Sequence, residues 1–212
     1  MKVENIEICI VGLGYVGLPL AIEFSKNFSV VGFDTNQKRV SELQKGFDRN
    51  QNDVQPTSSI LNRVTFTSSE SLISKCNVFI ITVPTPVDED NKPNLDPLKT
   101  ATELVGGHLK VNDVVIYEST VFPGCTEEIC VPILEKSSKL KYNIDFSCGY
   151  SPERINPGDK KNNLNQINKI LAYEGESQKV KTLLKNVYKK ICKKLIFSKN
   201  IKEAETAKGI EN

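Results

Sequence analysis

The sequence predicts an α/β fold in which helices cover both faces of a doubly wound, mostly parallel sheet. Two observations indicate this class. Short apolar runs alternate with helical patterns along most of the 212 residues, and that alternation is typical of βαβ units. The run VFIITV at 78–83 lacks polar alternation, as expected of a strand that is buried on both faces. A hydrophobic content of 39% is ample for a core.

Candidate strands and helices alternate through the first 150 residues. The strands are expected at 6–11, 28–33, 64–67, 78–83, 114–119 and 145–150. The helices are expected from about Leu18 and around 38–46, 71–76, 98–109 and 127–138. Because parallel neighbours need a long crossover connection, this order predicts a parallel arrangement.

The last third of the chain continues the sheet after a polar stretch at 155–168 that we interpret as a loop. A strand is expected at 169–175, then a basic amphipathic helix at 177–194, and an edge strand at 193–198. The final segment, 200–212, has the composition of a helix, with Asn200 as its N-cap. No stop signal closes that helix.

The charge is unevenly distributed. Residues 1–159 carry 15 Lys and Arg against 21 Asp and Glu, a net of −6, whereas residues 160–212 carry 13 against 5, a net of +8. The overall charge of +2 gives no reason to expect nucleic acid as a partner. The basic excess fits the solvated face of the helix at 177–194, with a docking surface for an anionic ligand or a membrane as the alternative.

Cysteine and histidine spacing predicts no metal site, since the six cysteines form no CxxC pair and His108 is the single histidine. No signal peptide and no apolar stretch long enough to span a bilayer is apparent. We therefore expect no membrane partner and a reducing, cytoplasmic location.

The segment GLGYVG at 12–17 follows the first predicted strand and opens a helix. Gly12 permits the tight turn, Gly14 lets the backbone approach a pyrophosphate, and Gly17 lets the helix pack on the sheet. Asp34 ends the second strand, 22 residues after Gly12. This context predicts a Rossmann-like nucleotide site, with a glycine turn unrelated to nucleotides as the alternative.

The acidic residue also predicts which cofactor binds. The Asp34 carboxylate would accept hydrogen bonds from the adenosine ribose and repel a 2′-phosphate, which favours NAD over NADP. Arg39 leaves two interpretations open, because an arginine there could receive a 2′-phosphate or contact the adenine side of NAD.

Polar side chains follow three further predicted strands. They are Thr85 in TVPTP, Ser119 and Thr120 in YESTVFPG, and Glu153 in GYSPER. Ligands of doubly wound sheets bind at the carboxyl ends of the strands, so these residues are candidates for one site. Taken singly, each threonine could equally serve a turn or a cap, and Glu153 could be a loop carboxylate.

Together these segments resemble a known family. GLGYVGLPLA, FDTN, TVPTP, YESTVFPGCTEE, GYSPERINPGDK and AETAKGIEN, in this order, are similar to the UDP-glucose and GDP-mannose dehydrogenases. The greatest similarity is to the branch that oxidises UDP-N-acetylglucosamine or UDP-N-acetylgalactosamine at C6. The resemblance implies a Rossmann-like NAD-binding domain at 1–199 and, at 200–212, the truncated beginning of a central helix through which full-length relatives form homodimers.

The activity implied by the resemblance is a four-electron oxidation of a primary alcohol to a carboxylate, with two NAD+ consumed and a UDP-sugar as substrate. A cysteine captures the aldehyde, and water hydrolyses the resulting thioester. Residues implied to bind the cofactor are Gly12, Gly14, Tyr15, Val16, Gly17, Asp34, Arg39, Thr85 and Thr120. Residues implied to act in catalysis are Thr120, which would hold the water, Glu153 as its general base, and Lys208 with Asn212 at the developing oxyanion.

The resemblance stops short of the nucleophile. In this family the reactive cysteine lies in a later segment, after the central helix, and none of the six cysteines here matches its motif. Cys148, close to Glu153 in sequence, is a poor substitute because a thiol buried in a strand is usually inert. We therefore expect NAD binding without complete activity. The alternatives are half of a split enzyme, a non-catalytic NAD-binding module or relic, or an unrelated dehydrogenase that shares the glycine loop.

Overall fold

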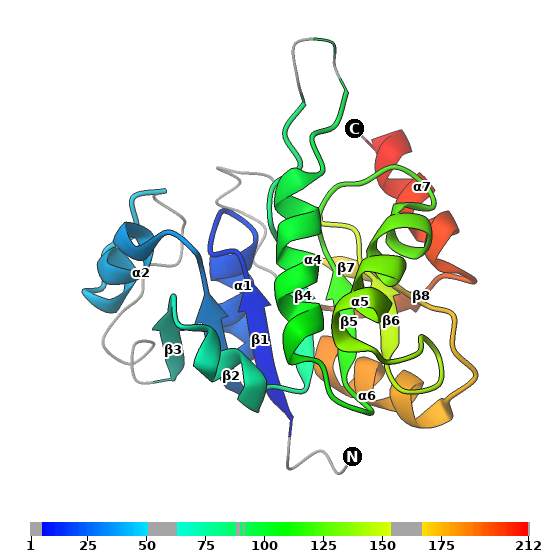
Figure 1. Cartoon of the computed structure of the whole chain (residues 1–212), viewed down its shortest axis with the longest axis horizontal. Coiled ribbons are helices and arrows are strands. Elements are labelled where there is room, and N and C mark those ends of the chain that lie inside the picture. Colours follow the sequence, from blue (N-terminus) through cyan, green and yellow to red (C-terminus); the bar gives the residue numbers. More distant parts are fainter. Residues whose placement is uncertain (1–5, 51–62, 88–89, 91, 154–166, 212) are drawn as a thin grey trace.

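The computed structural model describes residues 6–50, 63–87, 90, 92–153 and 167–211, and side chains as far as Ala207 (Figure 1). In this described part, eight strands form one sheet in the order β3-β2-β1-β4-β5-β6-β7-β8. The strands are β1 (Glu7–Val11), β2 (Ser29–Phe33), β3 (Val64–Thr67), β4 (Val78–Ile81), β5 (Val114–Tyr117), β6 (Ser147–Tyr150), β7 (Asn168–Tyr173) and β8 (Lys194–Phe197). The order reverses between β1 and β4, so the predicted doubly wound fold is confirmed.

Strand direction is uniform except at one place. Every neighbouring pair is parallel apart from β6 and β7, which are antiparallel, with Tyr150 opposite Ala172. The prediction of a mostly parallel sheet is therefore confirmed, and β8 lies at its edge as expected. Because β7 runs backwards, its first residues lie beyond the end of β6, on the side where the parallel strands finish.

Side chains of the central strands alternate between two apolar layers. Ile8 and Ile10 of β1 face one layer, whereas Cys9 and Val11 face the other. The first layer is covered by α1, α2 and α6, and the second by α4, α5 and α7. Burial on both faces explains why these strands are apolar throughout.

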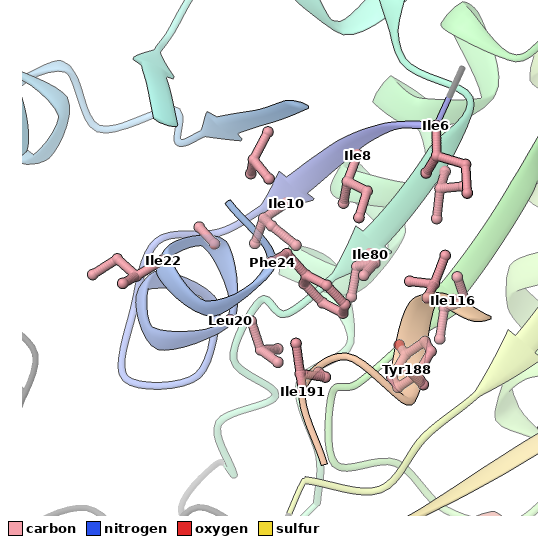
Figure 2. Close-up of a cluster of buried hydrophobic side chains, with 14 of the residues drawn as sticks. Ile6, Ile8, Ile10, Leu20, Ile22, Phe24, Ile80, Ile116, Tyr188 and Ile191 are labelled. Atoms are coloured by element: carbon pink, nitrogen blue, oxygen red, sulfur yellow. The ribbon is translucent and has the colours of Figure 1, made fainter. Parts of the chain in front are cut away.

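One of the two layers is shown in Figure 2. Ile8, Ile10 and Ile80 point from the sheet toward Phe24 of α1. The ring of Phe24 meets the ring of Tyr188 edge to face, with centroids 5.8 Å apart. Helices α1 and α6, which are far apart in sequence, therefore pack against each other in the same apolar layer.

The predicted helices are present as α-helices with adjusted bounds, except the one expected around 71–76. They are α1 (Gly17–Phe24), α2 (Gln37–Gln44), α4 (Asp96–His108), α5 (Val131–Ser138), α6 (Gln178–Tyr188) and α7 (Ile201–Glu211). Asn200 caps α7 as predicted, because its side chain accepts from the Glu203 N–H at 2.7 Å. None of the described helices is both long and apolar enough to cross a membrane.

Two predicted helices differ from expectation. The segment expected around 71–76 is a six-residue 3₁₀ turn, Glu70–Lys75. The helix expected over 127–138 begins with a π-helical turn, Thr126–Cys130, in which the Val131 N–H donates to the carbonyl of Thr126. Pro132 follows directly and has no N–H to continue a regular ladder, which accounts for the wider turn.

A buried aspartate before β5 makes stability depend on pH. Burial raises the pKa of Asp113 from 3.8 to about 6, and this outweighs the hydrogen bond and charge of Lys110. Between these pH values the folded protein keeps a proton that the unfolded chain has lost. Stability therefore falls as pH rises through this range.

We expect Asp113→Asn to flatten this dependence, because the amide keeps an acceptor for the Lys110 N–H and cannot ionise. Between pH 4 and 6, the free energy of unfolding of the wild type should fall more steeply with pH than that of the variant. The difference between the two slopes should approach about 1.4 kcal/mol per pH unit. Urea unfolding of wild type and variant across that range measures it, and parallel curves would contradict the assignment.

Candidate functional site at the carboxyl edge of the sheet

Five parallel strands end in one row. Val11 pairs with Phe33 on one side and Ile81 on the other, Ile81 pairs with Tyr117, and Tyr117 pairs with Tyr150. The loops that follow these residues therefore leave the sheet at the same edge. These loops carry, in strand order along the chain, the glycine segment 12–17, Asp34, Thr85, Thr120 and Glu153. The expected convergence of these residues is thus what the structure shows.

The glycine loop has the geometry that its spacing predicts. Gly12 has φ +97°, a conformation that favours glycine. A Cβ on Gly17 would overlap the carbonyl oxygen of Gly12, so that helix α1 can begin here only without a side chain. A Cβ on Gly14 would meet nothing within 4 Å. Gly14 therefore borders open space at the N-terminus of α1, where a pyrophosphate fits.

Thr82, which the sequence analysis did not single out, holds this loop. Its hydroxyl, at the end of β4, lies 2.8 Å from the Gly12 carbonyl and 3.1 Å from that of Val11. The residue begins the TVPTP segment, but a threonine after a strand gives no indication that its partner lies 70 residues earlier.

Asp34 and Arg39 bind the two backbone polar groups of Leu13, which belong to successive peptide groups. The Asp34 carboxylate accepts from the Leu13 N–H at 2.9 Å, and Arg39 Nε donates to the Leu13 carbonyl at 2.9 Å. Arg39 is buried and also donates to Asp48 at 2.5 Å. Its guanidinium is thus engaged by the protein, while its predicted contact with the cofactor stays a prediction. Tyr15, in the same loop, is half exposed.

Backbone and hydroxyl contacts join the loops after β4 and β5. The Thr85 hydroxyl donates to the Thr120 carbonyl at 2.5 Å, and the Ser119 hydroxyl donates to the Val83 carbonyl at 2.6 Å. The side chain of Thr120 is exposed, whereas Ser119 is buried. Thr120 is therefore the member of this pair that can reach a ligand.

Glu153 lies beside a buried charge cluster that the sequence analysis missed. Lys169 Nζ is 2.5 Å from Glu118 Oε2 and 4.0 Å from Glu153 Oε2. The Tyr188 hydroxyl donates to Glu118 Oε1 at 2.6 Å. Burial raises the pKa of Glu118 to about 7, although Lys169 opposes the rise. The pKa of Lys169 is raised by the two carboxylates against the effect of its own burial.

Helix α7 carries Lys208, whose side chain is not among those described, and Asn212 lies outside the described residues. The start of the helix is anchored to the site. Buried Glu205 accepts from the Gly124 N–H at 2.5 Å and the Thr126 N–H at 2.9 Å, just after the loop of Thr120. Glu205 precedes Lys208 by one helical turn, but no pattern in the sequence indicates its partners, which lie about 80 residues earlier.

The cysteines are unsuited to nucleophilic attack. All six are buried and free. Burial raises the pKa of Cys148 well above its ordinary value, and a neighbouring thiol, Cys130, together with burial raises that of Cys125. Within the described ranges, no group of three or more His, Cys, Asp or Glu could hold a metal ion.

Comparison with known proteins decides the family. Residues 6–192 match the model of the UDP-glucose/GDP-mannose dehydrogenase family, NAD binding domain. The chain belongs to this family. The family resemblance drawn from the motifs is thereby confirmed, and NAD is confirmed as the cofactor of the matched domain.

Individual members of the family are similar over nearly the whole chain. UDP-N-acetyl-D-glucosamine 6-dehydrogenase of Pseudomonas aeruginosa is 48% identical over 99% of this chain and 49% of its own length. Protein CapL of Staphylococcus aureus is 44% identical over 98% of this chain and 49% of its own length. The solved UDP-D-ManNAc dehydrogenase of Pyrococcus horikoshii superposes with a TM-score of 0.86 at 29% identity, covering 97% of this chain and 50% of that one. The chain spans about half the length of these relatives.

We expect Glu205→Ala to detach α7 from the loop after Thr120. Two buried N–H groups, those of Gly124 and Thr126, would lose their acceptor, at a cost of about 1–3 kcal/mol each. Glu203→Ala is the matched control, because Glu203 lies on the same helix but accepts its hydrogen bonds at the exposed surface. Urea unfolding should show a much larger loss for Glu205→Ala, and equal losses would refute this anchoring role.

Proposed function

We propose that this chain is the cofactor-binding portion of an NAD-dependent dehydrogenase that oxidises the C6 alcohol of a UDP-N-acetylhexosamine to the uronic acid. The observation that carries the proposal is the open space at Gly14, in a glycine loop that shares the carboxyl edge of the sheet with Glu153. The names of two relatives that are 48% and 49% identical, both UDP-N-acetyl-D-glucosamine 6-dehydrogenases, support the substrate class.

The residues present fit NAD. The space beside Gly14 receives the pyrophosphate at the N-terminus of α1, and Asp34 reaches the adenosine ribose. Tyr15 and Val16 belong to the glycine loop, Arg39 holds this loop through the Leu13 carbonyl, and the Thr85 and Thr120 segments, joined by a hydrogen bond, would contact the nicotinamide end. When bound, NAD+ supplies the acceptor for the hydride that leaves C6.

The proposed catalytic residues Thr120 and Glu153 lie in loops at the same carboxyl edge of the sheet. Thr120, whose side chain is exposed, holds the water, and Glu153 takes a proton from it as general base. Lys208 and Asn212, four residues apart in sequence, stabilise the developing oxyanion. In this proposal residues 1–199 form the NAD-binding domain, and 200–212 begin the central helix through which full-length relatives dimerise.

The described cysteines favour a second function for the chain when it is alone. With every thiol buried, and with the pKa values of Cys125 and Cys148 raised, the chain supplies no evident nucleophile for the aldehyde. It would then act as an NAD-binding module that needs a further polypeptide for turnover. The free thiols agree with a reducing compartment, and we place the protein in the cytoplasm.

The variant Gly14→Ala tests whether the open space beside Gly14 binds the pyrophosphate of NAD. Its Cβ enters open space, so the fold should be kept, but it occupies the approach of the pyrophosphate. We expect the affinity for NAD+, measured by calorimetry, to fall at least about tenfold, a loss of about 1.4 kcal/mol. Gly107→Ala, a methyl that also enters open space, is the control and should bind normally. Unchanged binding by Gly14→Ala would place the cofactor elsewhere.

Turnover tests the need for a second polypeptide. The purified chain, mixed with NAD+ and UDP-N-acetylglucosamine or UDP-N-acetylgalactosamine, should show binding of NAD+ but no sustained rise in NADH absorbance. The reason is the raised pKa of buried thiols such as Cys148. Continued NADH production by the chain alone would exclude the second function.

A further inference from the structure

The reversal of β7 brings a lysine to the carboxyl edge of the sheet. Since Tyr150 lies opposite Ala172 in the antiparallel pair, the chain before Ala172 runs alongside the residues after Tyr150. Lys169 therefore comes next to Glu153, at 4.0 Å between Nζ and Oε2. A parallel β7 would have started at the opposite edge.

Each charge of the cluster is enclosed. Lys169 has no exposed surface, Glu118 is 1% exposed and Glu153 is 6% exposed. Removing an ammonium and two carboxylates from water is costly, and a protein with well-packed apolar side chains in their place is often as stable or more so. Packing alone does not explain a lysine at position 169. A need to hold the two carboxylates of Glu118 and Glu153 close together does explain it.

We propose that Lys169 is a positioning residue for Glu153. Its ammonium, fixed by the short ion pair with Glu118, also attracts the second carboxylate and holds Glu153 at the edge where the loops converge. An ionised carboxylate is the form that can accept a proton from water. The inference deepens the proposed function, because it explains how a nearly buried glutamate can act as a base.

The groups that face the cluster come from four elements. Glu118 follows β5, Tyr150 and Glu153 belong to the end of β6 and its loop, and Lys169 lies in β7, whereas Tyr188 ends α6 and Cys192 follows it. The pKa values of the two tyrosines are raised, mainly by burial, so both hydroxyls stay neutral near pH 7. Within the cluster, Glu153 is therefore attracted by Lys169 and repelled by Glu118.

The test follows the Glu153 carboxyl directly in the 212-residue chain by ¹³C NMR of labelled glutamate, with the resonance assigned through Glu153→Gln. In Lys169→Met the midpoint of its titration should move up by about one pH unit or more, because the attracting charge is gone. In Glu118→Gln the midpoint should move down, because the repelling carboxylate is gone while the lysine remains. A merely structural role would not produce shifts of opposite sign.

Matched controls complete the experiment. Lys181→Met removes an exposed lysine from α6, near Phe197, and should leave the midpoint unchanged. Lys169→Arg keeps the charge and should restore most of the wild-type titration. If Lys169→Met fails to fold, Glu118→Gln provides the test. A downward shift of the Glu153 midpoint in Glu118→Gln supports the proposal, and an unshifted midpoint overturns it. An unshifted Glu153 midpoint in a folded Lys169→Met variant also overturns the proposal.

The readout is independent of cofactor binding. Loss of NAD+ binding by the wild-type chain would refute the proposed function and leave the titration result intact. Conversely, a chain that binds NAD+ but shows no shift in either variant would retain the proposed function and refute the role of Lys169.

Discussion

The common register of the parallel strands is the constraint on which the site depends. Val11, Ile81, Tyr117 and Tyr150 lie in one row of the sheet, so four loops begin at the same height. A slip of one residue in any strand would turn its side chains to the opposite layer of the core. The cost of such a slip, summed over two buried faces, fixes the positions from which the loops start.

The loops are then bound to one another rather than left to find their own conformations. Thr82 holds the carbonyl of Gly12, Thr85 holds that of Thr120, and Ser119 holds that of Val83. Each bond links a residue after one strand to the backbone after its neighbour. A ligand at this edge therefore meets a surface that is already ordered, which lowers the entropic cost of binding.

Buried charged side chains need specific partners, whereas buried apolar side chains do not. The core follows from alternation along the strands and needs no specific partner, as Ile8 and Cys9 illustrate by facing opposite layers. Lys169 and Glu118 tolerate burial only together, because either alone would be an uncompensated charge. Their pairing depends on the antiparallel direction of β7, so one exception in a parallel sheet determines the electrostatics of the edge.

The sequence by itself determined the order of strands and helices, the glycine loop and the family, because these depend on neighbours in the chain and on spacing within a few residues. It also indicated which loops carry Asp34, Thr120 and Glu153. Only the tertiary structure decided the partners of Thr82, Lys169 and Glu205, since each contacts a residue distant in sequence. A buried lysine in a strand has the same letters around it as an exposed one, and only the fold brings its carboxylates within reach.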